Sequence, residues 1–374
     1  MKFHKLNLAA LPDNLYNNQT HVKKWLELVT SSEDGFAPNS LNQVQPVERD
    51  VEIERLAGIA FYMLGNVLPF ALPPLLISTL FSETGAFILK FVLGYFTILY
   101  TVTKYYNGKF IKKYNRPSDL SPIDTKDNQY LHTERNNQKY LSVQFVWPDT
   151  LQRPAFENQP MIFCAIPHGV APMGITAYPF WSKLFNDKLC HWTCAPVILK
   201  IPILQKYMKG IGYIPAKASN ISDTLTKKEE NVGIILDGIA GMFQSHDEMA
   251  YVKKRKGIVK IALRCGVPLV PVYGFGHTSL WKVVVDPFGF LEALSLKLDV
   301  SLTPFFGRWF WFLGPPVRVP ICICMGDPIK CPKVENPTQE EIDKYHGLLV
   351  KGYEQVFEQH KKAYGWGDKV LKFV

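Results

Sequence analysis

The stretch RKGIVKIALRCGVPLVPVYGFG, residues 255–276, decides the fold class. Residues 253–265 carry apolar side chains at helical spacing, and Gly266 follows at the position where helices commonly end. Residues 269–273 are β-rich, and an earlier apolar run at 232–236 precedes the helix. The resulting order of strand, helix and strand is typical of a parallel sheet covered by helices.

Further apolar, β-rich runs occur at residues 161–166, 196–199, 282–285 and 319–325, with helical patterns between several of them. Near the C-terminus, Thr338 and Glu341 form a capping box before a long apolar stripe, and Gly365 marks the expected end of that helix. The sequence therefore predicts an α/β fold with a mixed, partly parallel sheet flanked by helices.

Two uncharged segments precede this region. Residues 56–82 contain no charged side chain, and a run of that length exceeds the roughly 20 residues needed to cross a bilayer core. A second uncharged run, 91–103, follows after a short connector. We interpret the pair as an N-terminal membrane-embedded hydrophobic hairpin, and two buried core helices are the alternative. Basic residues flank both ends, which predicts that both termini lie in the cytosol.

Four parts follow from these patterns: a polar cytosolic arm at 1–54, the membrane hairpin at 55–104, a polar linker at 105–140, and an α/β domain at 141–374. Within the arm, the apolar residues around Trp25 predict one short helix, and the remainder is expected to be irregular.

Composition narrows the class of protein. Of 374 residues, 47% are hydrophobic, which excludes a disordered chain, and only 20% are charged, below the roughly 25% of soluble domains. The net charge of +9 indicates an anionic partner. The membrane hairpin explains this charge better than nucleic-acid binding does. The seven cysteines include no C-x-x-C pair, so we expect reduced thiols and no metal site.

The most informative candidate site is Pro167-His168-Gly169, directly after the apolar run 161–166. Side chains at the end of a parallel strand lie where α/β proteins bind ligands. A histidine there suits a general base at neutral pH, and a helix starting near Val170 would offer N–H groups to an oxyanion. The alternative is a hydrogen-bonded structural histidine.

Two more segments could contact a substrate. The loop beginning Leu236-Asp237-Gly238 follows an apolar run and is rich in small residues, which allows close approach of the backbone to a ligand. The basic run from Lys253 to Lys256 would start the next helix, where cations oppose the helix dipole unless an anion is bound. An ordinary glycine turn and a solvated charged surface are the respective alternatives.

Motifs of other enzyme classes are missing from the sequence. It contains no G-x-S-x-G, H-E-x-x-H, Walker A or G-x-G-x-x-G pattern. Serine hydrolase, zinc protease, P-loop and dinucleotide-binding functions therefore have no local support.

Several strings resemble motifs of the type 2 diacylglycerol acyltransferase family. Pro167-His168-Gly169 resembles the core of its H-P-H-G signature, and residues 255–276 resemble its R-K-G-F-x-x-x-A-L-x-x-G-x-x-L-V-P-x-x-x-F-G block. The stretches FFGR, MGDPIKCPKVENPTQEEIDKYH and EQHKKAYG also fit, as does the position of the hairpin. The resemblance covers roughly residues 55–366.

The resemblance implies an integral membrane enzyme of the endoplasmic reticulum or lipid droplets. Its donor would be acyl-CoA, its acceptor diacylglycerol, and its products triacylglycerol and CoA, with no further cofactor, no metal and no covalent acyl-enzyme. His168 would be the general base and Gly169 part of the oxyanion site. The expected substrate-binding residues are Pro167, Asp237, Gly238, Arg255, Lys256 and Gly257, with Arg255 and Lys256 facing the CoA phosphates.

The sequence departs from the family pattern at three places that concern the site. Ile166 replaces the first histidine of H-P-H-G, Gly241 stands where the family loop P-G-G-x-x-E has its glutamate, and His277 replaces the glutamate of F-G-E-N. Related glycerolipid acyltransferases carry an aspartate five residues after the histidine, where this chain has Met173. The acceptor therefore stays open between diacylglycerol and a monoacylglycerol or long-chain alcohol. A non-catalytic lipid-droplet protein and a homo-oligomer also stay open.

Overall fold

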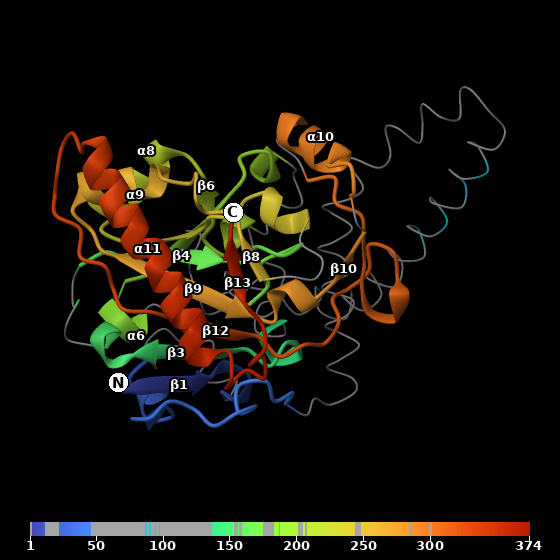
Figure 1. Cartoon of the computed structure of the whole chain (residues 1–374), viewed down its shortest axis with the longest axis horizontal. Helices are drawn as coiled ribbons and strands as arrows, with labels where there is room; N and C mark the ends of the chain where they lie inside the picture. The colour runs from blue at the N-terminus through green and yellow to red at the C-terminus, as the bar shows by residue number, and fades with distance from the viewer. Residues whose placement is uncertain are drawn as a thin grey trace, which may run out of the picture.

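Figure 1 shows the computed structural model, in which helices pack on a large central sheet. The structure describes residues 2–11, 22–45, 87, 90, 94, 97, 137–152, 156, 159–174, 183–186, 188–200, 205, 208–243, 248–284, 286–298 and 301–374. Within this part of the chain the main sheet has nine strands in the order β2-β1-β3-β12-β9-β4-β7-β5-β6.

The labelled α-helices are α2 (Val22–Leu26), α6 (Lys183–Asn186), α8 (Ala218–Thr226), α9 (Gly257–Cys265), α10 (Phe290–Leu298) and α11 (Gln339–His360). The strands of the main sheet are β1 (Phe3–Asn7), β2 (Thr30–Ser32), β3 (Gln144–Pro148), β4 (Ile162–Ile166), β5 (Cys190–Cys194), β6 (Ile214–Pro215), β7 (Asn231–Ile235), β9 (Leu269–Phe275) and β12 (Cys322–Met325). Two small ladders pair β10 (Lys282–Val283) with β11 (Phe305–Phe306) and β8 (Glu248–Ala250) with β13 (Leu371–Phe373).

The centre of the sheet is parallel. Strand β4 pairs in parallel with β7 on one side and with β9 on the other, and β5 continues the parallel order beyond β7. On the other side, β12 runs antiparallel to β9, and β1 runs antiparallel to β3. The prediction of an α/β fold with a mixed, partly parallel sheet is therefore confirmed.

Strand β4 is buried on both faces. Phe163 and Ala165 point into one hydrophobic cluster, together with Trp25 from the N-terminal segment. Ile162 and Cys164 point into a second cluster, which also contains the apolar faces of α8, α9 and α11. Because successive residues of a strand face opposite sides of the sheet, a continuous apolar run is what a strand covered on both faces requires.

Capping patterns in the sequence predict the start of one helix and the end of another. Helix α11 begins as predicted, because the Thr338 hydroxyl accepts the Glu341 N–H at 3.2 Å and the Glu341 carboxylate accepts the Thr338 N–H at 2.8 Å. Helix α9 ends as predicted at Gly266, whose φ of 67° is left-handed. Its start differs from the prediction, because residues 253–255 form turns before the helix and Lys256 is its N-cap.

The prediction of a strand at residues 196–199 was wrong. The strand is β5, Cys190–Cys194, and the chain turns after it, where the Ile198 N–H donates to the Ala195 carbonyl at 3.0 Å. Pro196 lacks an N–H group and cannot donate to a strand ladder, so the apolar run after it forms a 3-10 helix instead.

The N-terminal segment is more ordered than predicted. Strands β1 and β2 extend the main sheet beyond β3, so the expectation of an irregular arm outside the short helix α2 was wrong. His4 on β1 is buried, and its ring nitrogens bond Ser31 and Asp149 at 2.8 and 2.9 Å. Partners for the polar side chain allow a mixed sequence to form a buried strand.

The predicted hairpin, residues 55–104, lies outside the described residues except for Phe87, Lys90, Gly94 and Thr97. Most of the predicted linker does too, although residues 137–140 at its end are helical. Among the helices that are described, none combines the length and hydrophobicity needed to cross a bilayer.

Candidate active site

Three loops meet at the carboxyl edge of the three central parallel strands. Strand β4 leads to His168, β7 leads to Asp237, and β9 leads to His277. The registers pair Ala165 with Ile235 and Ile166 with Tyr273, so the three strands end side by side. The carboxyl edge of a parallel sheet is the usual ligand site of α/β proteins.

His168 has the geometry of a base. Its Nδ1 lies 2.8 Å from the carbonyl oxygen of Gly169, so Nδ1 carries the proton that is donated to this acceptor. The neutral ring then keeps its lone pair on Nε2. Burial lowers the pKa of His168 from 6.5, and the bond to Gly169 opposes that change in part. His168 is therefore neutral and able to accept a proton at pH 7, while its side chain remains partly exposed.

Gly169 and His277 lie in contact. A Cβ atom at position 169 would stand 3.0 Å from the His277 carbonyl oxygen, and the φ of Gly169 is 59°, so glycine is required here for both space and backbone conformation. The backbone of Pro167 also lies close to the His277 ring. The loop after β4 thus rests directly on the loop after β9.

His277 is fully buried. Its Nε2 lies 2.5 Å from the carbonyl oxygen of Met173, and its Nδ1 has no hydrogen-bond partner within the described part of the chain. Burial lowers the pKa of His277 to about 4, with a smaller contribution from the charge of His168 nearby. His277 is therefore neutral at pH 7 and supports the loop that carries His168.

Asp237 holds the backbone of His168. The His168 N–H donates to Asp237 Oδ2 at 3.2 Å. Asp237 is completely buried, and its Oδ1 has no partner among the described residues. Burial raises its pKa to about 7, although the N–H groups of His168 and Tyr251 and the charge of Arg255 act in the opposite direction. The carboxyl group therefore titrates close to neutral pH.

Asp237 also occupies the space beside Gly241. A Cβ atom built at position 241 would overlap the Asp237 Cβ and stand 3.0 Å from its Oδ2. A side chain at position 241 and the present side chain at position 237 therefore compete for one volume. The family's glutamate at position 241 is absent, but a carboxyl group from position 237 fills the volume that a side chain there would enter.

Arg255 lies beside the loop after β7. A Cβ atom at Gly238 would lie 3.5 Å from Arg255 Nη2, so the guanidinium covers the loop after β7. Its charge also acts on Asp237. Arg255 is exposed, which leaves the cation accessible to an anionic ligand at the edge of the site.

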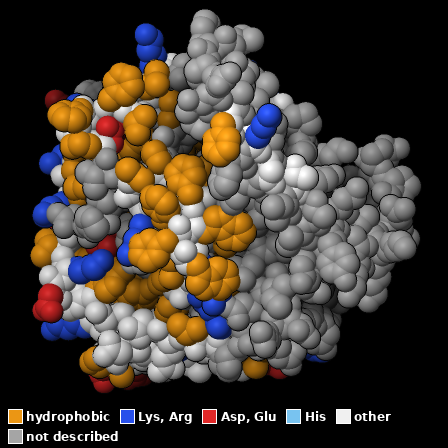
Figure 2. All heavy atoms as spheres, turned by 90° about the vertical axis from the view of Figure 1, so that its right-hand side faces the viewer, with side chains coloured by type: hydrophobic (Ala, Val, Ile, Leu, Met, Phe, Trp, Pro, Cys, Tyr) orange, Lys and Arg blue, Asp and Glu red, His pale blue; other side chains and the backbone are white. Residues whose placement is uncertain are grey.

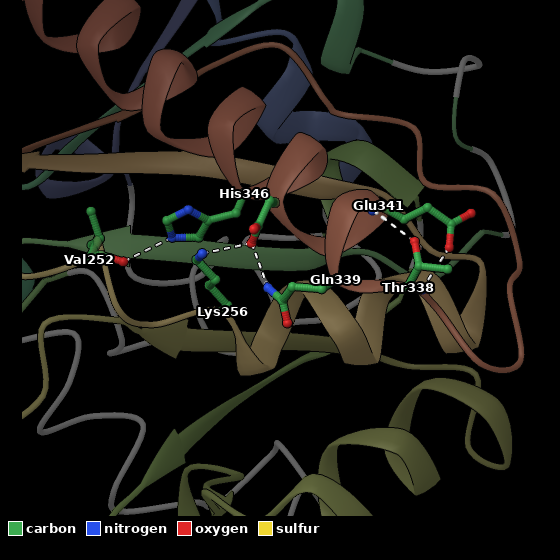
Figure 3. Close-up of polar contacts among 7 residues, drawn as sticks. Val252, Lys256, Thr338, Gln339, Glu341 and His346 are labelled. Atoms are coloured by element: carbon green, nitrogen blue, oxygen red, sulfur yellow. Dashed lines mark hydrogen bonds and ion pairs between the residues drawn. The ribbon is translucent and has the colours of Figure 1, made fainter.

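Lys256 points elsewhere. Its Nζ pairs with Asp343 Oδ1 at 2.7 Å, and Gln339 Nε2 donates to the same oxygen at 2.7 Å (Figure 3). His346 on α11 also bonds the Val252 carbonyl at 2.9 Å. These contacts fasten the 252–256 segment to α11. Gly257 begins α9 and faces open space.

The expected helix after Gly169 is not present in the residues that are described there. Residues 170–174 form bends and a turn, Pro172 supplies no N–H group, and Gly174 has a φ of 90°. Of the predicted site residues, the structure brings together Pro167, His168, Gly169, Asp237, Gly238 and Arg255. The Lys256 side chain is directed to Asp343 instead, and Gly257 faces open space.

Two features of the site had no signal in the local sequence. The contact between Gly169 and His277 joins loops more than 100 residues apart, and the shared volume of Asp237 and Gly241 depends on how one loop folds back on itself. The position of His277 directly after a β-rich run was the available hint. Among the described residues, no group of three His, Cys, Asp or Glu side chains is placed to hold a metal ion.

Comparison with known sequences identifies a family. A sequence model described as "Diacylglycerol acyltransferase" matches residues 91–373. Human "Acyl-CoA wax alcohol acyltransferase 2" is 32% identical over 53% of this chain and 65% of its own length. "Diacylglycerol O-acyltransferase 2-like protein 6" from Bos taurus is 32% identical over 55% and 68%, and "Diacylglycerol O-acyltransferase 2" from Xenopus tropicalis is 30% identical over 56% and 63%.

The match thus spans slightly less than two thirds of the length of the human and Xenopus tropicalis relatives and slightly more than two thirds of the Bos taurus relative. Among solved structures, the 1-acyl-sn-glycerophosphate acyltransferase PlsC from Thermotoga maritima aligns over 82% of this chain and 97% of its own, at 14% identity. The TM-score of 0.37 is too low for the alignment to support a conclusion.

Proposed function

The chain belongs to the diacylglycerol acyltransferase family, and from that premise we propose that it transfers an acyl group from acyl-CoA to the hydroxyl of diacylglycerol. The observation that carries the proposal is the geometry of His168. It lies at the carboxyl end of the central strand β4, with Nδ1 bound to the Gly169 carbonyl and Nε2 free of a proton.

The proposed reaction is a direct transfer. His168 Nε2 takes the proton of the acceptor hydroxyl as its oxygen attacks the thioester carbonyl. The carbon–sulfur bond then breaks, CoA leaves as a thiolate, and the proton on His168 converts the thiolate to the thiol. The N–H groups of Gly169 and Val170, which donate to no acceptor within the described part of the chain, are our candidates for stabilising the oxyanion.

Asp237 is assigned as a positioning residue. The sequence indicated substrate binding, but complete burial and the bond to the His168 N–H favour a supporting role. A carboxyl group that holds the backbone of the base fixes where the imidazole stands relative to the substrate, and a displacement of about 1 Å in such a group can lower a rate about a hundredfold.

The acceptor is the finer part of the proposal. The name of one relative refers to wax alcohols and the names of others to diacylglycerol, so a long-chain alcohol is the specific competitor. The test is an assay of the full chain in microsomes with labelled acyl-CoA and three separate acceptors: a diacylglycerol, a monoacylglycerol and a long-chain alcohol. Triacylglycerol should be the fastest product. A faster wax ester would reassign the acceptor, and no product above that of microsomes lacking the protein would indicate a non-catalytic lipid-binding protein.

We also propose that the chain acts at the endoplasmic reticulum membrane or lipid droplets, anchored through residues 55–104. Support comes from the uncharged runs 56–82 and 91–103 and from the nature of the substrates. Transfer of each acyl CH₂ group from water to an apolar site is favourable by about 0.8 kcal/mol, so both substrates partition into lipid.

Replacing Arg255 with glutamine is expected to raise the KM for acyl-CoA about tenfold with little change in the KM for diacylglycerol. Arg255 is an exposed cation beside Gly238, and charge-assisted hydrogen bonds to CoA phosphates contribute about 1.5–3 kcal/mol. Steady-state kinetics with each substrate varied in turn provide the measurement. Lys256 pairs with Asp343, so phosphate binding by Lys256 would require that pair to open.

The matched control for Arg255→Gln is Lys253→Gln, which removes an exposed cation two residues away in the same segment. It should leave both KM values nearly unchanged. Equal effects of the two variants would show that the basic segment acts through its general charge and not through a phosphate contact.

The rate should depend on the protonation of His168. Because burial lowers the pKa of His168, kcat/KM should rise with pH along an acid limb whose midpoint lies below 6.5. Protonated His168 cannot accept the proton of the acceptor, which is why activity is lost on the acid side. Initial rates between pH 5 and 8 measure this limb, and a midpoint above 7 would contradict the assignment.

Unfolding at acid pH would also lower the activity, so it must be measured separately from the titration of His168. His277 and His360 are buried with pKa values of about 4, below their unfolded value near 6.5. They therefore contribute stability that is present above pH 6.5 and is lost as the pH falls toward 4. Thermal unfolding recorded at each pH shows where this destabilisation begins.

A further inference from the structure

One face of the protein exposes large aromatic side chains on two segments, residues 288–290 and 309–312. Figure 2 shows hydrophobic side chains gathered there, with basic side chains among them. The most exposed aromatics, which we call the aromatic face, are Phe288 (93%), Phe310 (72%), Phe290 (67%), Trp309 (66%) and Phe312 (50%). Soluble proteins rarely expose a cluster of large apolar side chains unless it contacts a membrane or another molecule.

The loop that carries Trp309 and Phe310 is fixed in an unfavourable conformation. Both residues have left-handed backbones, with φ values of 57° and 55°, which bulky residues rarely adopt. The Gly307 N–H donates to the Trp311 carbonyl at 2.9 Å, and the Arg308 N–H donates to the Pro315 carbonyl at 2.8 Å. The backbone therefore holds two aromatic rings out of the core, and strain retained in this way commonly accompanies function.

Two cationic side chains lie over exposed aromatic rings. Lys282 Nζ lies 4.6 Å from the centre of the Phe310 ring, and the Arg308 guanidinium lies 4.4 Å from the centre of the Trp309 ring. Aromatic rings with adjacent Lys and Arg side chains are typical of surfaces at the boundary between lipid headgroups and acyl chains, where the rings enter the apolar layer and the cations meet anionic headgroups.

The aromatic face is joined to the candidate active site through the chain. The segment that follows His277 passes through the buried residues Leu280 and Trp281 and enters β10 at Lys282. Strand β10 pairs with β11, and the Leu313 N–H after the aromatic loop donates to the Phe305 carbonyl of β11 at 2.9 Å. A molecule bound at the aromatic face would therefore lie next to the elements that support the site.

We propose that the aromatic face docks into the headgroup and acyl boundary of an anionic lipid bilayer, independently of the hydrophobic segment at 55–104. Docking would bring lipid substrates to the site without passage through water. The inference rests on the proposed function for its purpose, but the docking itself requires no catalysis.

The depth of residue 310 in a membrane tests the proposal. The full chain carrying Phe310→Cys is spin-labelled and reconstituted into vesicles of phosphatidylcholine and phosphatidylserine, and collision with oxygen is compared with collision with a water-soluble nickel chelate. At position 310, collision of the spin label with oxygen should exceed collision with the nickel chelate severalfold. The matched control is Leu348→Cys, a 42% exposed apolar residue on α11, and Figure 1 shows this helix apart from β10 and α10. Collision with the nickel chelate should be favoured there. Labelled wild-type protein gives the background from native cysteines.

Each other outcome overturns the proposal. If position 310 resembles position 348, the aromatic face lies in water. If both reagents are excluded from position 310, protein covers the face, either as a second copy or as another part of the chain. Equal depth on vesicles of phosphatidylcholine alone would overturn the role of anionic lipid. Because the readout contains no turnover, a failure of docking and a failure of the proposed acyl transfer are observed separately.

Discussion

Replacing His168 with alanine is expected to lower the rate of acyl transfer about 10²–10⁴-fold while the protein still folds. The imidazole accepts the acceptor's proton through Nε2, and alanine offers no base. His168→Gln should lose a similar factor, because an amide can accept a hydrogen bond but does not take a proton at neutral pH. Product formation from labelled acyl-CoA, normalised to folded protein, is the measurement.

His191→Gln is the matched control for His168. His191 is buried, and its Nδ1, like that of His168, lies close to a backbone carbonyl, that of Gly212 at 2.9 Å. It lies on β5, where it is paired with Val232 of β7. A near-normal rate in the control with a large loss at His168 would separate catalysis from general destabilisation. Near-normal turnover by His168→Ala would remove the proposed base.

The central part of the fold was predictable because its signals are local. The apolar runs that became β4, β7 and β9 are buried on both faces, so nearly every position is apolar and the strands stand out in the sequence. Gly266 and the Thr338 capping box marked helix ends through the backbone groups that they satisfy. A histidine two residues after the central strand led to the prediction of the candidate site.

Other parts depend on contacts between distant segments. Strand β1 was missed because His4 interrupts its apolar pattern, and its burial depends on Ser31 and Asp149, which are remote in sequence. The ion pair between Lys256 and Asp343 was not predicted, because the two residues are 87 positions apart in the sequence. The group that supports His168 was likewise not evident, because no pattern shows that the carboxylate after β7 reaches the loop after β4.

Exchanging the carboxyl group between positions 237 and 241 should show that this group is what the site requires. Asp237→Gly alone should lower kcat about tenfold to a hundredfold, because it removes the acceptor of the His168 N–H and hydrogen bonds to charged groups contribute about 1.5–3 kcal/mol. Gly241→Glu alone should be at least as damaging, because its side chain would overlap Asp237. The double variant Asp237→Gly with Gly241→Glu should have a kcat at least about tenfold higher than the less active of the two single variants. A coupling of that size is within the range found for residues in contact.

Two further variants separate the filling of space from the carboxyl chemistry. Asp237→Gly with Gly241→Gln fills the same volume without a titratable group, and Asp237→Asn keeps an acceptor for the His168 N–H. Because burial raises the pKa of Asp237 to about 7, both should remove any inflection of kcat near that pH while leaving the acid limb of His168. If the double exchange is no more active than either single variant, the two positions do not share one role. If the inflection near pH 7 survives in Asp237→Asn, another group titrates there, and Asp237 only fills space beneath the catalytic loop.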